Sequence, residues 1–161
     1  MHSCYCRFAA YFKNYKLVHE EIEIKRVRCK SCNSTHAVLP IDIIAYRLLS
    51  LFVILFVLFS FHIKETPVLK IADRVGHSFQ FVYSALYSFE KYIYKIHHFF
   101  RQASSVTAPL TACPVSLLML MRAYNPVIMF QYDYISKNKK PCFMCKYFDG
   151  TRGPPVGRIP L

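Results

Sequence analysis

The chain of 161 residues has room for one ordinary domain or two very small ones, and its hydrophobic content of 54% is enough for a buried core. Wholesale disorder is therefore not expected. The net charge of +12, from 21 Lys and Arg against 9 Asp and Glu, favours anionic partners, either nucleic acid or an acidic membrane face.

The cysteines indicate the compartment in which the protein works. Four of the seven form two C-x-x-C pairs, Cys29/Cys32 and Cys142/Cys145, and the first residues lack the apolar segment of a signal peptide. We therefore expect a cytoplasmic protein, because in a reducing compartment such pairs bind metals or carry out redox chemistry. Neither pair lies in the βαβ setting of a thioredoxin-like motif, so zinc is the better interpretation.

The first pair lies in the sequence RVRCKSCNSTHAVLP, at 26–40. The turn between Cys29 and Cys32 can direct two thiolates at one zinc ion, which requires about 2.3 Å from each sulfur. A tetrahedral site needs two more ligands. The candidates are Cys4 and Cys6, with His2 and His36 as substitutes.

The segment 1–40 is predicted to be a zinc-ribbon-like unit. Zinc ribbons join two ligand-bearing turns by a hairpin, and residues 16–28 are the candidate for it. In EIEIKRVR, Ile22 and Ile24 alternate with charged residues, a pattern that predicts a half-buried strand leading into the second turn.

The segment LLSLFVILFVLFSFHI, at 48–63, is apolar on every side. A membrane-spanning helix needs about 20 apolar residues, and this shorter run lies between Arg47 and Lys64. We therefore predict a buried core helix, covered by other helices or by a second subunit in a homodimer. The alternative is a small membrane-associated protein that is anchored by this segment and turns its basic surface to anionic lipid.

A helix-turn-helix is predicted over 68–87. Thr66 can cap a helix whose first position is Pro67, Gly76 can end that helix in a left-handed turn, and Ser78 can cap the next one. Gly76 is the first glycine of the chain, and the next is Gly150. An ordinary pair of antiparallel helices, which uses the same turn without touching DNA, is the alternative.

The second of these helices extends beyond the turn. Apolar residues recur at alternating spacings of four and three, which predicts a core stripe packed on the helix of 48–63. The residues of the stripe are Val82, Leu86, Phe89, Ile93, Ile96 and Phe100.

After residue 102 the helical pattern weakens. Region 103–149 is poorly defined and contains a candidate helix at 115–124, and 150–161, rich in glycine and proline, is predicted to be a flexible tail. A second metal site in this region is the weaker hypothesis, because a tetrahedral site needs four ligands and the region offers three, Cys113, Cys142 and Cys145.

The sequence RVRCKSCNSTHAVLPIDIIAY, at 26–46, and the segments that follow it resemble an uncharacterised bacterial domain family. Its members open with a zinc ribbon and continue into a transposase-like helix-turn-helix. The resemblance covers 4–100 and implies DNA binding in a mobile-element or regulatory setting, here by a truncated or degenerate copy. It is strongest at Cys29, Cys32, Thr35, His36, Leu39, Pro40 and Tyr46.

Two features depart from that family. The family opens with C-P-x-C, whereas this chain has Cys4-Tyr5-Cys6, so its first turn is one residue shorter. Aromatic residues also hold positions where polar side chains usually reach bases. These residues are Phe79, Phe81, Tyr83 and Tyr87.

A catalytic role is not expected. An acidic-triad transposase needs three carboxylates that converge on two metal ions within a large domain, and the nine acidic residues here are scattered. The chain also lacks a phosphate-binding loop, a G-x-S-x-G elbow and an H-E-x-x-H helix.

These observations predict a mainly α fold with a small β element, in which a zinc-ribbon hairpin (1–40) precedes a helical region (41–102). The expected function is zinc-dependent, non-catalytic DNA binding. The residues expected to face the major groove are Ser78, Gln80, Tyr83, Ser84 and Tyr87, and those expected to contact phosphates are Lys70, Arg74, Lys91 and Lys95.

Overall fold

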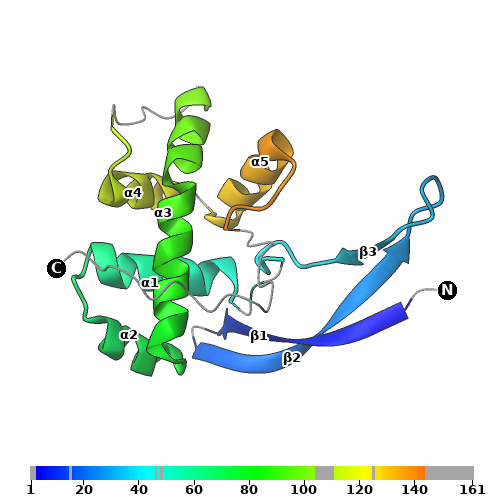
Figure 1. Ribbon diagram of the computed structural model, residues 1–161, viewed down its shortest axis with the longest axis horizontal. Helices are drawn as coiled ribbons and strands as arrows, with labels where there is room; N and C mark the ends of the chain where they lie inside the picture. Colours follow the sequence, from blue (N-terminus) through cyan, green and yellow to red (C-terminus); the bar gives the residue numbers. More distant parts are fainter. Residues whose placement is uncertain are drawn as a thin grey trace.

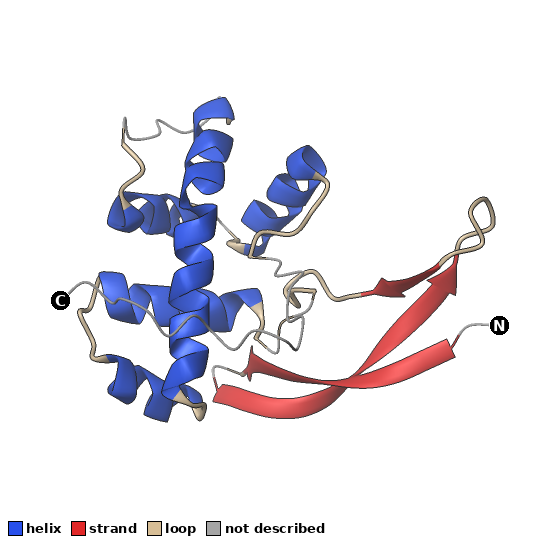
Figure 2. Cartoon of the chain, in the orientation of Figure 1, coloured by secondary structure: helices blue, strands red, loops and turns tan. Residues whose placement is uncertain are grey.

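A computed structural model describes residues 3–14, 16–45, 47, 49–103, 111–124 and 126–143. In these residues an antiparallel three-stranded sheet precedes five helices, a mainly α fold with a small β element (Figures 1 and 2). The strands are β1 (Ser3–Lys13), β2 (Lys16–Arg28) and β3 (Thr35–Val38). The helices are α1 (Leu51–His62), α2 (Val68–Val75), α3 (Phe79–Gln102), α4 (Pro114–Ala123) and α5 (Ile128–Asn138).

The sheet has the order β1-β2-β3 and extends away from the helices (Figure 2). We expected a hairpin within 16–28, but these residues form the single strand β2, which pairs with β1 along its whole length. The chain reverses instead at Asn14, which has a φ of +50°, and at the turn between β2 and β3. The alternating isoleucines explain the continuous strand, because they keep one face of β2 apolar.

Helix α1 lies at the centre of the hydrophobic core. It is shorter than the predicted 48–63, because Ser50 is its N-cap and accepts a hydrogen bond from the N–H of Val53 at 3.4 Å. Its sides pack on β1, α2, α3 and α4, and Val57 is fully buried. No helix in the described part of the chain has the length and hydropathy needed to cross a membrane.

Helices α2 and α3 are joined by a tight turn at Gly76. This glycine has the predicted left-handed conformation, with a φ of +63°, and its N–H donates to the carbonyls of Ala72 and Asp73. The expectation for Pro67 was wrong: it is the N-cap of α2 with an extended backbone, not the first helical residue. Side chains on the inner faces of both helices are buried, namely Ile71, Ala72, Val75, Val82 and Ala85.

The core stripe of α3 packs on α1 as expected, and its distal end meets an aromatic cluster that the sequence did not predict. Phe99 contacts Phe130 and Tyr134 of α5, and Phe100 contacts Phe130, with ring centroids 5.5–5.7 Å apart. Helix α4 begins one residue before the predicted 115–124, whereas α5 was not predicted. The segment predicted as a flexible tail lies outside the described residues.

The burial of Val57 gives a test of the core. We expect Val57→Asp to lower the free energy of unfolding by about 3–5 kcal/mol, because it places an unpaired carboxylate among apolar side chains. Urea denaturation followed by circular dichroism measures the change.

Leu69→Asp is the matched control, since it introduces the same group on α2 at a side chain that is 67% exposed. Its effect should stay within about 0.5 kcal/mol of wild type. Equal losses in the two variants would contradict the core assignment.

Candidate functional site

The N-terminal half of α3 presents most of the residues predicted to face DNA. Ser78, Gln80, Tyr83 and Tyr87 are exposed, on the side of the helix opposite the core. Ser84 differs, because it is half-buried and its hydroxyl accepts a hydrogen bond from Arg47 Nη1 at 2.9 Å. Four of the five predicted groups are therefore accessible together.

The predicted phosphate contacts lie on both helices. Lys70 and Arg74 are exposed on α2, and Lys91 and Lys95 are exposed on α3. The ammonium group of Lys91 lies 4.4 Å from the ring centroid of Tyr87, and that of Lys95 lies 5.1 Å from the ring centroid of Tyr92. These basic groups are thus interleaved with aromatic rings.

Arg47 links α3 to two distant segments, and the sequence did not predict this role. Its guanidinium donates hydrogen bonds to the hydroxyls of Ser84 and Ser88, and Nε donates to the carbonyl of Phe143 at 3.3 Å. The planar guanidinium offers five donors in fixed directions, so one side chain can hold three partners. Arg47 therefore fixes the position of α3 relative to the loop after β3.

Two histidines connect the sheet to the Gly76 turn. His19 Nε2 lies 3.0 Å from the carbonyl oxygen of Val75, so this nitrogen carries the proton and donates. The rings of His19 and His77 are 4.6 Å apart, and His77 stacks on Phe81. A Cβ on Gly76 would lie 3.3 Å from His19 Nε2, so the glycine also admits this close approach. No sequence pattern marked His19, because its partner lies 56 residues away.

The predicted metal ligands Cys29 and Cys32 lie at the exposed turn between β2 and β3. The N–H of Cys29 donates to the carbonyl of Ser34, which closes the turn, and Cys32 Sγ lies 4.0 Å from His36 Nε2. The pKa of the Cys29 thiol is lowered, first by the Ser31 hydroxyl, and that of Cys32 is lowered by the backbone N–H of Ser34. Both effects favour the thiolate, the form that binds zinc.

The strand register separates these thiols from the first cysteine pair. Cys4 pairs with Lys25 of β2, which precedes Cys29 by four residues. Cys6 pairs with Glu23, which precedes Cys29 by six residues. At a strand rise of about 3.3 Å per residue these steps correspond to about 13 and 20 Å. Across the described ranges, no group of three or more His, Cys, Asp or Glu is close enough to hold a metal ion. Cys29 and Cys32 therefore offer two ligands at the turn, and the four cysteines are not gathered at one point.

The other candidate ligands are dispersed. Cys113 is the N-cap of α4, whereas Cys142 is fully buried, which raises the pKa of its thiol well above the ordinary value. Burial of this kind disfavours the thiolate. His2 and Cys145 lie outside the described residues.

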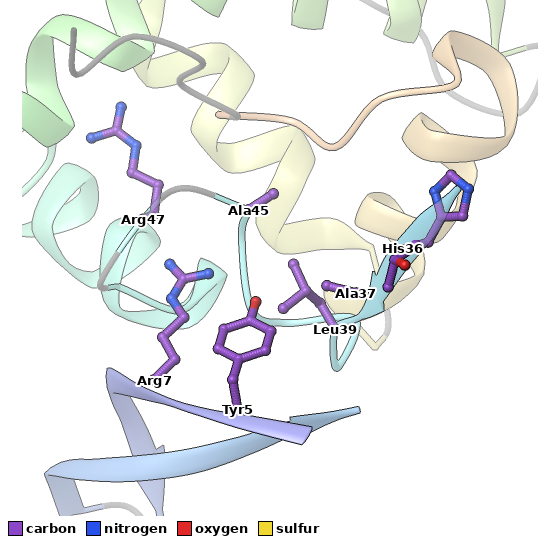
Figure 3. A pocket seen from close by; sticks show the side chains of 8 residues that line it. Tyr5, Arg7, His36, Ala37, Leu39, Ala45 and Arg47 are labelled. Carbon is purple, nitrogen blue, oxygen red and sulfur yellow. The ribbon is translucent and has the colours of Figure 1, made fainter. Parts of the chain in front are cut away.

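An open cleft of about 620 Å³ lies between β1, β3 and the loop after β3 (Figure 3). Arg7 extends into it from β1, and burial lowers the pKa of its guanidinium. Arg47 also lines the cleft, and Tyr5, Thr35 and His36 complete the polar lining. None of the described lining residues is acidic, so the cleft is positively charged.

Comparison with known proteins gave no matching family model, no matching curated protein and no matching solved structure. Two arrangements are candidates for function: the basic and aromatic surface on α2 and α3, and the cysteine pair at the tip of the sheet.

The histidine contacts give a pH prediction. Burial lowers the pKa of His77, and the neighbouring His19 lowers it further. Burial also lowers the pKa of His62, although Glu90 has a smaller, opposing effect. The unfolded chain therefore binds more protons, so the stability contributed by the neutral rings is present above about pH 6.5 and is lost as pH falls below it. We expect the urea concentration at the unfolding midpoint to decrease as the pH is lowered from about 7.5 to about 5.5.

His77→Phe keeps a ring against Phe81 and removes the titration, so it should reduce this fall. His98→Phe, at an exposed position on α3, is the control and should leave the fall unchanged. A pH profile that is identical in wild type and His77→Phe would contradict the assignment.

Proposed function

We propose that the protein is a non-catalytic DNA-binding protein that uses α2 and α3 as a helix-turn-helix, as the resemblance to transposase-like proteins implies. The observation that carries the proposal is the turn at Gly76. It joins an eight-residue helix to α3 and leaves the first turns of α3 exposed next to basic side chains. In helix-turn-helix proteins the first residues of the second helix contact base edges in the major groove.

The arrangement of the neighbouring helices supports the same proposal. Helix α1 packs on both α2 and α3, so the pair rests on a third helix. The buried inner faces include small side chains, Ala72 and Ala85, which take up little space between the two helices. The exposed face remains available for a ligand.

Within this proposal the contacts divide by chemistry. Gln80 carries an amide, the group that pairs with adenine edges, and it would contribute to base recognition with Ser78, Tyr83 and Tyr87. Ser84 has a structural role, because its hydroxyl is held by Arg47. The cations would neutralise phosphates without reading sequence, at Lys70, Arg74, Lys91 and Lys95.

We further propose that the turn between β2 and β3 binds zinc through Cys29 and Cys32. The lowered pKa values of both thiols and the nearby His36 support this assignment. Zinc bound there would order the turn. Cys4 and Cys6 could contribute only if the end of β1 moved toward the turn, since the register holds them opposite Lys25 and Glu23.

The DNA-binding proposal is tested with duplex and single-stranded oligonucleotides. We expect binding whose affinity falls steeply as salt rises, because each neutralised phosphate releases condensed counterions. Gln80→Ala should reduce the preference among DNA sequences, measured by selection from a random library, whereas Lys91→Ala should weaken binding to all sequences alike.

Gln102→Ala is the matched control for Gln80→Ala, since it removes the same amide at the exposed C-terminal end of α3. It should leave the selected sequences unchanged. Failure of the wild-type protein to bind either form of DNA at low salt would overturn the proposed function.

The zinc proposal predicts about one zinc ion per chain in the purified protein. Cys29→Ser and Cys32→Ser should each release the metal, measured by elemental analysis, while Cys113→Ser, at the start of α4, should retain it. Cys4→Ser and Cys6→Ser decide whether the first pair takes part. If the protein contains no zinc when it is purified without added chelator, the zinc proposal is contradicted.

A further inference from the structure

Helix α3 carries an exposed row of aromatic side chains. Phe79, Tyr83 and Tyr87 recur at every fourth residue, and Tyr94 follows seven residues later, so the four rings share one face of the helix. Their side chains are 48%, 39%, 46% and 75% exposed, respectively. The row is about 22 Å long, at 1.5 Å per helical residue.

This aromatic row does not belong to the core. The buried residues of α3 lie elsewhere on the helix, and none of them belongs to the row; they are Val82, Ala85, Leu86, Ser88, Phe89, Ile96, Phe99 and Phe100. Two contacts order the row: the rings of Phe79 and Tyr83 meet edge to face at 6.3 Å, and Lys91 lies over Tyr87. The rings are therefore held in place at the surface without being buried.

The charges beside the row favour a polyanion. Helix α3 carries Lys91, Lys95 and Arg101 against one acidic residue, Glu90. The ammonium group of Lys91 lies over the Tyr87 ring, 4.4 Å from its centroid, so a cation covers one face of this exposed ring. A ligand with flat rings and a phosphate backbone matches both features.

The form of nucleic acid follows from what aromatic rings can do. In a duplex the bases offer only their edges, which hydrogen-bonding side chains read. Unpaired bases offer their faces, on which aromatic side chains stack irrespective of sequence. A recognition helix that holds rings where polar groups usually stand is better suited to stacking than to reading edges.

We propose that the aromatic row of α3 binds DNA with unpaired bases, by stacking bases on Tyr83 and Tyr87 while Lys91 moves from the Tyr87 ring to the adjacent phosphate. This inference rests on the proposed function and names the form of DNA that the same helix prefers. In this binding mode, base stacking is the main contribution to the affinity for single-stranded DNA.

The experiment compares an oligothymidylate with a duplex of equal length by fluorescence anisotropy, using the full chain. We expect the single strand to bind about tenfold more tightly. Tyr83→Ala should weaken single-strand binding about tenfold, whereas Tyr83→Phe should stay within about twofold of wild type, because the phenyl ring still stacks.

Tyr132→Ala is the matched control, since it removes a tyrosine on α5 that is 57% exposed and should leave affinity unchanged. A second measurement uses tyrosine fluorescence, because the chain contains no tryptophan. Unlabelled oligothymidylate should quench the emission, and Tyr83→Phe should show less quenching at equal saturation.

Three outcomes would overturn the inference. If the duplex bound at least as tightly as the single strand, the inference would be overturned, but the proposed function would stand. Equal losses in Tyr83→Phe and Tyr83→Ala would show that the hydroxyl acts, which excludes stacking as the main contact. Absence of binding to either form would overturn the inference and the proposed function together.

Discussion

The architecture depends on the need to cover α1 on most of its sides, which leaves only Phe52 and Phe61 of its large side chains exposed. The helix is apolar around its whole circumference, so no single neighbour can cover it. Strand β1 and the helices α2, α3 and α4 each take part of its surface, and Phe12 of β1 meets Phe56 of α1 at 5.8 Å. Elements from distant parts of the chain therefore gather around one helix, and this gathering positions α3 with one face in the core and one outside.

The two faces of α3 differ in what they contact. The inner face supplies the core stripe and the aromatic cluster shared with α5. The outer face carries rings and cations that add nothing to the core, and exposed rings of this number are uncommon on a surface without a partner. Arg47 adds a polar link on the flank between them, where Ser84 and Ser88 accept its hydrogen bonds. A ligand on the outer face would therefore meet a helix that is already held rigidly.

The sheet has a different role. Among the strand residues whose burial the structure describes, only Ala9, Ala10 and Ile24 are buried, and the turn that holds Cys29 and Cys32 stands at the end remote from the helices (Figure 1). A small sheet with so little core gains stability mainly from backbone pairing, and a metal at its tip would order the turn. The histidine contact between β2 and the Gly76 turn is the route by which the sheet meets the α2–α3 pair.

The sequence by itself determined the local elements. Apolar runs and periodic stripes placed α1, α2 and α3 within a few residues, and the left-handed turn at Gly76 followed from its position, because these features depend on neighbours in the chain. Only the tertiary structure decided which of these residues meet. The register of β1 against β2 places Cys4 and Cys6 far along the strand from Cys29. The loop after β3 packs on α3, where Arg47 donates a hydrogen bond to Ser84. Strand register and loop docking arise from long-range packing, which no local pattern encodes.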